Sequence, residues 1–394
     1  MTPPIPAARL QQVQAPIIPE IAGLIRDHPG TISLGQGVVA YGPPPQVLES
    51  LRQFGTDPDQ HRYGPAAGDP ELLELIAAKL QRENRMGLAG RRIFVTAGAN
   101  MGFLHALFAI ADPGAEVILP LPFYFNQEMA VRMLGCRPVP VATDADYRLD
   151  PVAVRAAITP RTRAVVTISP NNPTGMVYDE AELRDVNALC RESGIYHISD
   201  EAYENFVYDG ASHFSPGSIS GAEQHTLSLY SLSKAYGFAG WRIGYLVIPE
   251  HLAEAVTKVQ DTNLICAPRI SQHAAAAALR VGSAYCSGRL PELAEVRRQV
   301  LEELAALGDS CRLPPARGAF YLLLKAAIRL DSLSVARRLI EEHRVAVIPG
   351  IAFGLTEGCY LRLSYGALDG ATAREGARRL VQGLDAIAAT APAS

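Results

Sequence analysis

Apolar residues along the chain recur in two alternating patterns, one typical of strands and one typical of helices. Short apolar runs rich in β-branched residues predict buried strands, and apolar residues at helical spacing predict the helices between them. The predicted strands lie at residues 93–96, 116–119, 137–141, 163–168, 196–199, 226–230 and 242–247. The predicted helices lie at residues 101–111, 124–135, 150–158 and 180–193. This alternation predicts an α/β fold with a mostly parallel sheet covered by helices on both faces.

The pattern changes on either side of this region. Residues 1–19 are rich in proline and glutamine, which predicts an extended arm. Residues 249–306 are predicted to be largely helical, and the remainder combines strands at residues 318–324 and 360–364 with two helices, the signature of a small α+β domain. We therefore expect an N-terminal arm (1–45) that joins the small domain, a large domain (46–290) and a small C-terminal domain (291–394).

Composition narrows the class of protein. The chain has 394 residues, 48% of them hydrophobic and 19% charged, which is ordinary for a soluble enzyme. Its net charge of −4 gives no basic field for nucleic acid. Charged residues or prolines interrupt each apolar run, so we expect no membrane span, and without a signal peptide we expect the cytoplasm. The six cysteines form no C-x-x-C pair, which argues against a metal site and against a disulfide framework.

A glycine motif near the N-terminus offers one alternative function. Gly35-Gln36-Gly37-Val38-Val39-Ala40 is a literal dinucleotide-binding fingerprint, which favours a nicotinamide dehydrogenase. That fingerprint requires a helix that opens on the glycines. The prolines at residues 43–45 cannot continue such a helix, so we reject this interpretation.

Lysine is scarce, and one lysine stands in an unusual setting. Lys234 follows the apolar run at residues 227–230, whereas we expect Lys79, Lys258 and Lys325 to be surface lysines on helices or at strand ends. A lysine held partly out of water favours its neutral amine, which is a nucleophile that forms Schiff bases with aldehydes. Pyridoxal phosphate is the cofactor that uses such a lysine. The alternative is an ordinary lysine that extends from a strand end to solvent.

Four polar motifs follow predicted strands or open predicted helices. In chain order they are Gly98-Ala99-Asn100, Asn171-Asn172-Pro173-Thr174-Gly175, Asp200-Glu201-Ala202-Tyr203 and Ser231-Leu232-Ser233-Lys234. Each alone has an ordinary explanation as a helix cap or a turn. Ligands on parallel sheets bind at the carboxyl ends of strands, so their joint occurrence there predicts one site.

With these motifs the chain resembles the class I and II aminotransferases, which are pyridoxal-phosphate enzymes of fold type I. The resemblance extends from Leu34 to Ser364. It is carried by Asn-Pro-Thr-Gly (172–175), Asp-Glu-Ala-Tyr (200–203), Ser-x-Ser-Lys (231–234) with Gly-Trp-Arg-Ile-Gly (240–244), Gly-Ala-Phe-Tyr (318–321) and Val-Ile-Pro-Gly (347–350).

The resemblance implies roles around the cofactor ring. Lys234 would bind pyridoxal 5'-phosphate as a Schiff base and then move the proton of the substrate Cα. Asp200 would pair with the pyridine nitrogen, and Asn172 and Tyr203 would hydrogen-bond the ring oxygen. Tyr124 would stack on the ring.

The resemblance also implies the ligands of the phosphate and the substrate. The phosphate ligands within the chain would be Ser231, Ser233, Arg242 and the N–H groups of Ala99 and Asn100. Tyr63 would reach the phosphate of the neighbouring subunit, which implies a homodimer with shared active sites. Arg362 would bind the substrate carboxylate with the help of Gly37 and Asn172, although an arginine in a strand is more often an ion-pair residue.

Asn100 departs from part of the family. Relatives that favour aspartate have a lysine at this position, placed for the distal carboxylate. An uncharged Asn100 instead predicts neutral or aromatic amino-acid substrates, in a pocket lined by Ile17, Ile18, Tyr41 and Phe353. The expected activity is transfer of the amino group of an L-amino acid to a 2-oxo acid. A lyase or synthase of the same fold, such as a cysteine-sulfur lyase, is the alternative.

Overall fold

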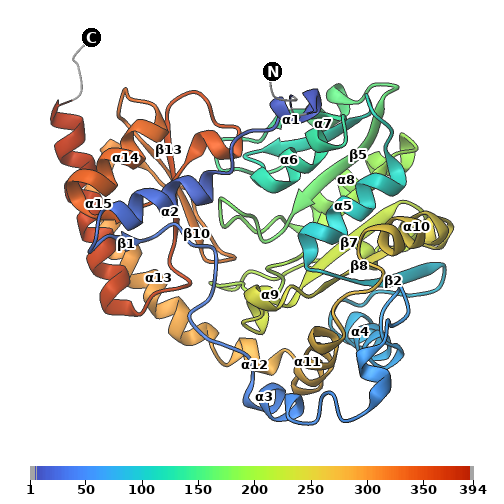
Figure 1. Cartoon of the computed structure of the whole chain (residues 1–394). Helices are drawn as coiled ribbons and strands as arrows, with labels where there is room; N and C mark the ends of the chain where they lie inside the picture. The colour runs from blue at the N-terminus through green and yellow to red at the C-terminus, as the bar shows by residue number, and fades with distance from the viewer. Residues whose placement is uncertain (1–4, 6, 391–394) are drawn as a thin grey trace.

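A seven-stranded sheet with strand order β2-β8-β7-β6-β5-β3-β4 forms the centre of the larger part of the molecule (Figure 1). The computed structural model describes residue 5 and residues 7–390. The strands are β2 (Arg91–Thr96), β3 (Glu116–Leu121), β4 (Arg137–Ala142), β5 (Thr162–Ile168), β6 (Tyr196–Asp200), β7 (Thr226–Ser231) and β8 (Gly244–Pro249). β8 runs antiparallel to both neighbours, and the other pairs are parallel. The predicted mostly parallel sheet is confirmed.

Helices cover both faces of this sheet because its strands are apolar on both sides. Alternate residues of one strand, such as Phe94 and Val95, belong to different apolar clusters on opposite faces. On one face lie α5 (Ala99–Ile110), α6 (Phe125–Met133) and α10 (Ala253–Asn263). On the other face lie α4 (Pro70–Glu83), α7 (Pro151–Ala157), α8 (Glu180–Glu192) and α11 (Arg269–Val281).

The smaller part is built on an antiparallel sheet with strand order β12-β13-β10-β9. Its strands are β9 (Cys311–Arg312), β10 (Tyr321–Ala326), β12 (Ile348–Pro349) and β13 (Cys359–Ser364). Its helices are α13 (Leu290–Leu304), α14 (Ser332–His343) and α15 (Gly370–Thr390). This arrangement confirms the expected α+β part.

The N-terminal segment packs with this smaller part. β1 (Ile32–Ser33) pairs in parallel with β11 (Val345–Ala346), and α2 (Ile17–Asp27) packs on α14. In Figure 1 this segment then crosses to α3 (Pro45–Leu51) at the edge of the larger part. The domain limits at residues 45/46 and 290/291 stay a prediction.

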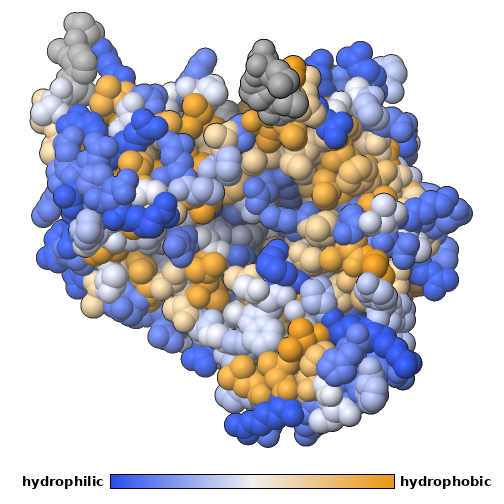
Figure 2. Space-filling model, in the orientation of Figure 1, coloured by the Kyte–Doolittle hydropathy of each residue, from blue (hydrophilic) through white to orange (hydrophobic). Residues whose placement is uncertain are grey.

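The border between the two parts holds the polar motifs. Figure 1 places the short helix α9 (Leu232–Ala235) there, and the surface is hollowed between the two parts in Figure 2. No helix opens on the glycines after β1, since residues 34–44 form no helix. Among residues 5 and 7–390, no helix is long and apolar enough to cross a membrane.

Candidate active site

One cavity of about 140 Å³ lies where β5, β6 and β7 end beside one another. Because these strands are parallel neighbours, the segments that follow Ile168, Asp200 and Ser231 meet at one edge of the sheet. The N-terminus of α5 completes the enclosure. The lining residues are Ala99, Asn100, Tyr124, Ile168, Asn172, Asp200, Ala202, Tyr203, Ser231, Ser233, Lys234 and Arg242.

Lys234 reaches this cavity from the single turn of α9. The Ser231 hydroxyl caps that turn by accepting a hydrogen bond from the Ser233 N–H at 3.1 Å. The Lys234 Nζ donates to the Gly37 carbonyl at 2.6 Å. Burial, with help from the Arg242 and Arg362 cations and against the effect of Asp200, lowers the pKa of Lys234 to about 8. A large share of this amine is therefore neutral at mildly alkaline pH.

Asp200 is a buried carboxylate with two hydrogen-bond donors. The Gln127 Nε2 donates to its Oδ2 at 2.8 Å, and the Ala202 N–H donates to its Oδ1 at 3.2 Å. Burial raises the pKa of Asp200 to about 6, against the effect of these two donors and of Lys234. A cationic N–H that faces this carboxylate would favour its charged form.

The other end of the cavity is suited to an anion. α5 begins there at Ala99, and a helix N-terminus presents unpaired N–H groups and a positive dipole. The Arg242 guanidinium lies against this turn, where it donates to the Ala239 carbonyl at 2.8 Å and to the Ala97 carbonyl at 3.4 Å. A Cβ at Gly98 would overlap that guanidinium, so glycine is required there.

A chain of hydrogen bonds joins four side chains from the two parts of the molecule: Arg362, Asn172, Tyr203 and Tyr321. The Arg362 Nη1 donates to Asn172 Oδ1 at 3.0 Å, and the Asn172 Nδ2 donates to the Tyr203 hydroxyl at 3.4 Å. The Tyr203 hydroxyl is 2.8 Å from that of Tyr321. The Arg362 guanidinium lies 4.7 Å from the centre of the Tyr321 ring and 5.2 Å from that of Phe353. The Arg362 Nη2 donates to the Gly35 carbonyl at 2.6 Å, and the Nε is buried without a partner among the described residues.

Tyr124 is held at its hydroxyl. The Asn126 Nδ2 donates to it at 2.9 Å, and Asn100 is a second hydrogen-bond partner. Behind Tyr124, Ile17 and Phe353 pack with Phe125 in one apolar cluster.

Two residues expected in the side-chain pocket, Ile18 and Tyr41, do not line the cavity itself. Ile18 is exposed, and the Tyr41 hydroxyl donates to the main-chain oxygen of Lys234 at 3.1 Å. The pocket wall of Ile17, Ile18, Tyr41 and Phe353 stays a prediction.

Comparison with known proteins identifies the family. Residues 29–380 match the family described as aminotransferase class I and II. The chain belongs to the class I and II aminotransferases. Aromatic aminotransferase ISS1 of Arabidopsis thaliana is 35% identical to this aminotransferase over 379 residues, which are 94% of each chain. The aspartate/prephenate aminotransferase of Thermus thermophilus is 36% identical over 357 residues, 89% of each chain.

Solved structures agree with this assignment. The aromatic aminotransferase from Pyrococcus horikoshii superposes on this aminotransferase with a TM-score of 0.83 at 33% identity, and the match covers 93% of this chain and 99% of that one. The resemblance, the fold class and the transferase activity predicted from the sequence are confirmed.

Most of the predicted site residues of this aminotransferase line the cavity, and three do not. Gly37 and Arg362 contact the lining through Lys234 and Asn172. Tyr63 is outside the cavity and 80% exposed. Gln127 and Tyr321 were missed as site residues. Tyr321 ends the Gly-Ala-Phe-Tyr motif, whereas no local feature of the sequence points to Gln127.

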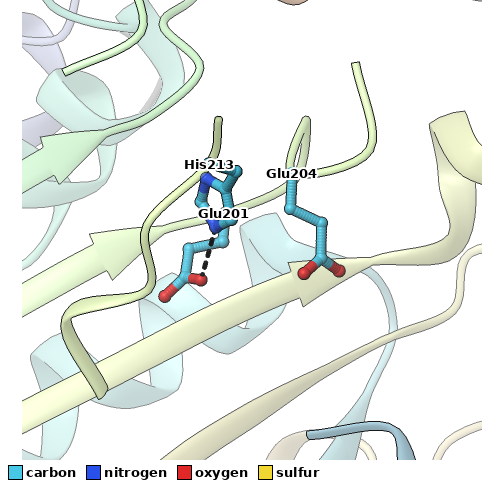
Figure 3. Close-up of side chains that lie close together, drawn as sticks. All are labelled: Glu201, Glu204 and His213. Carbon is cyan, nitrogen blue, oxygen red and sulfur yellow. Dashed lines mark hydrogen bonds and ion pairs between the residues drawn. The ribbon is translucent and has the colours of Figure 1, made fainter. Parts of the chain in front are cut away.

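A cluster of two glutamates and a histidine begins at Glu201, the residue after Asp200. Glu201, Glu204 and His213 approach one another closely enough to hold a metal ion (Figure 3). His213 pairs with Glu201 at 3.0 Å, while Lys79 pairs with Glu204 at 2.5 Å. The expectation that Lys79 is a surface residue is wrong, since this lysine is buried.

The partners of Glu204 favour an internal ion-pair network at this cluster. Asn84 donates to the second oxygen of Glu204 at 2.7 Å, so both oxygens are in use. A metal ion would have to displace a buried ammonium group. The predicted lack of a metal stays a prediction.

Proposed function

We propose that this aminotransferase uses pyridoxal 5'-phosphate bound through Lys234. The observation that carries the proposal is one cavity lined by Lys234, by the buried carboxylate of Asp200 and by the N-terminus of α5. An amine, a carboxylate and an anion-binding helix terminus complement the aldehyde, the pyridine nitrogen and the phosphate of this cofactor.

The phosphate end would rest on fixed donors. The N–H groups of Ala99 and Asn100 and the hydroxyls of Ser231 and Ser233 line the cavity beside Arg242. The Arg242 guanidinium lies against the turn at Gly98, and this contact holds it in position. Such preorganised donors bind a phosphate without a further cost in ordering.

The ring would be held at its nitrogen, its oxygen and its face. Asp200 would accept from the pyridine N–H while Gln127 holds the other side of the carboxylate. Tyr203 and Asn172 would donate to the ring oxygen, and Tyr124 would cover the ring. When bound, pyridoxal phosphate withdraws electrons from the substrate Cα.

Lys234 would carry the proton in the reaction. Its pKa of about 8 lies near neutrality because burial and the two arginine cations disfavour the ammonium form. A base with such a pKa can accept the proton of the substrate Cα and return it, which general acid–base catalysis requires. Arg362 would bind the substrate α-carboxylate through its planar guanidinium, which matches a carboxylate in a bidentate manner.

The substrate class proposed is neutral and aromatic L-amino acids with a 2-oxo acid acceptor. Asn100, at the cavity mouth, carries no charge and bonds Tyr124, so it offers no cation to a distal carboxylate. A buried carboxylate without a partner is costly. The Arabidopsis and Pyrococcus relatives, both named aromatic aminotransferases, support this class, whereas the name of the Thermus relative includes aspartate.

We also propose a homodimer with shared active sites, because the Tyr63 side chain and apolar side chains near it are exposed on the surface of this chain. Arg269 at the start of α11 donates to the Arg62 carbonyl beside Tyr63, and the neighbouring Ile270 is exposed. Apolar side chains gather where α3 and α11 lie (Figure 2), and Leu48 of α3 is among the exposed ones. Burial of such a patch in a subunit interface is favourable. The cytoplasm stays the proposed location.

Visible spectra and a donor panel test the proposal. Protein loaded with pyridoxal phosphate should show a visible band that changes when an amino donor is added without an acceptor. Across aspartate, glutamate, glutamine, methionine, phenylalanine and kynurenine with one acceptor, kcat/KM should be highest for the neutral and aromatic donors. Ammonia and pyruvate released from cysteine without any acceptor would instead indicate a lyase. Aspartate at the head of the panel would contradict the proposed substrate class.

A further inference from the structure

Two buried tyrosine hydroxyls face each other across the border of the two parts. Tyr203 follows β6 in the larger part, and Tyr321 begins β10 in the smaller part. The two oxygens are 2.8 Å apart, and the residues are 6% and 1% exposed. Their rings pack edge to face with centroids 5.4 Å apart.

The surroundings of Tyr321 fix its hydroxyl in place. The main chain of Gly37 closes over it, since a Cβ there would stand 2.5 Å from the Tyr321 oxygen. Gly175, of the Asn-Pro-Thr-Gly motif, packs equally closely on the Tyr321 carbonyl. The Arg362 guanidinium covers the ring face at 4.7 Å. The hydroxyl is therefore held in one position, aimed at Tyr203.

The places of the two hydroxyls favour one direction of the hydrogen bond, and the charges around the pair agree with it. Burial raises the pKa of Tyr321 to about 12, and the nearby Arg362 cation limits the rise. Burial raises the pKa of Tyr203 well above its usual value, and the Tyr321 hydroxyl raises it further. Either hydroxyl can donate across the 2.8 Å, but only Tyr203 lines the cavity, so Tyr321 is assigned as the donor and Tyr203 as the residue whose proton can reach a ligand there. Tyr203, which also accepts from Asn172, keeps its own proton for another acceptor.

We propose that Tyr321 is a positioning residue of the active site: its hydroxyl donates to Tyr203 and so directs the Tyr203 proton toward the ring oxygen of the cofactor. The inference rests on the proposed function, in which Tyr203 contacts that oxygen. A hydroxyl that accepts one hydrogen bond donates a second more strongly, because successive bonds polarise one another. Tyr321 would act only through Tyr203.

The test compares Tyr321→Phe, Tyr203→Phe and the double variant. Phenylalanine keeps the ring that Arg362 covers and removes only the oxygen. Tyr365→Phe is the control, since Tyr365 is also 1% exposed, lies in the same part of the chain and does not line the cavity. Melting temperatures should fall by similar amounts in Tyr321→Phe and Tyr365→Phe, which separates a loss of stability from an effect on the site.

The decisive readout is the pH titration of the visible absorption of the protein loaded with pyridoxal phosphate. A donor to the ring oxygen stabilises negative charge there, so its loss raises the apparent pKa of the bound cofactor. Tyr321→Phe should raise that value by roughly 0.3–1, as expected for one modest hydrogen bond. Tyr203→Phe should raise it more, and adding Tyr321→Phe to that background should change nothing further.

Two results would overturn the inference. One is a Tyr321→Phe titration that coincides with the wild type and with Tyr365→Phe. The other is an equal shift with and without Tyr203, which would mean that Tyr321 acts independently. A wild-type protein without a pH-dependent visible band contradicts the proposed function itself, and the inference falls with it.

Discussion

The Gln127 side chain donates a hydrogen bond to Asp200 at 2.8 Å. Gln127 lies in the first turn of α6, and Asp200 is the last residue of β6. This contact gives a buried carboxylate a neutral donor, which partly offsets desolvation. It leaves the pKa of Asp200 at about 6, above its usual 3.8. In the protein without cofactor, the ionised form of Asp200 therefore destabilises the fold.

Asp200→Asn should stabilise the cofactor-free protein at neutral pH. A raised pKa contributes stability that is full below about pH 4 and is lost as the pH rises through about 6. The interval from 3.8 to about 6 corresponds to about 3 kcal/mol at pH 8. Urea unfolding of wild type and variant from pH 4.5 to 8 measures this, with the exposed Asp261→Asn as a control for net charge. A difference that stays constant with pH would contradict the prediction.

Lys234→Ala should abolish transamination and leave the fold intact. No other amine lines the cavity, so neither cofactor attachment nor proton transfer has a substitute. Borohydride reduction of the loaded wild type followed by peptide mapping should find the adduct at Lys234. Lys258→Ala is the matched control, because Lys258 is exposed and pairs with Glu254. An adduct at Lys79, Lys258 or Lys325 would contradict the site.

Gly98→Ala should weaken pyridoxal phosphate binding at least tenfold. The added Cβ would displace the Arg242 guanidinium from the N-terminus of α5. Gly114→Ala is matched in backbone strain, with φ +88° against +82°, but its Cβ would meet nothing within 4 Å. Both variants should lose about 1–2 kcal/mol of stability. Titration of the cofactor-free proteins gives the affinities, and equal affinities in the two variants would separate Arg242 from phosphate binding.

Asn100→Lys should raise kcat/KM for aspartate about ten- to a hundredfold, because an ammonium at the cavity mouth would supply a charge-assisted hydrogen bond. Phenylalanine should gain nothing, since it has no distal charge. Asn100→Gln extends the side chain without charge and should leave aspartate poor. If Asn100→Lys and Asn100→Gln use aspartate equally, position 100 does not face the distal group of the substrate.

Mixing Tyr63→Ala with Lys234→Ala protein should restore activity once subunits exchange. If Tyr63 serves the neighbouring site, a mixed dimer has one site with both lesions and one intact site. Because one of its two sites is intact, each mixed dimer should have up to about half of the activity of a wild-type dimer. Exchange is verified with two affinity tags, and an inactive mixture of verified mixed dimers would place Tyr63 in its own subunit's site or in none.

The sequence predicted the strand ends and the residues on them because both are local. Asp200 and Lys234 each follow an apolar run, and parallel strands must bring their carboxyl ends together. Gln127 and Tyr321 contact their partners across 73 and 118 residues, and no local pattern reports such a distant contact. Lys79 was misplaced for the same reason, since its partner Glu204 is 125 residues away.

The direction of each strand in the sheet was the other feature that the sequence pattern did not predict. A buried strand has the same apolar pattern in either direction, so the antiparallel course of β8 was hidden. The predicted strand at 242–247 begins at Gly244 instead, because Arg242 has a positive φ of 52°. Non-glycine residues rarely take this conformation, and nothing in the side chain of arginine predicts it.

The pairing of β1 with β11 also sets the order of events during synthesis. Ile32 pairs with Val345, about 300 residues later in the chain. At about 5–20 residues per second, the ribosome needs roughly 15–60 s to make that stretch. The β-strands of the larger part are all complete by Pro249, so they can pair while β1 is still alone. The N-terminal segment therefore stays unpaired while most of the chain is made. The border between the two parts, which holds Lys234, forms only when translation is nearly finished.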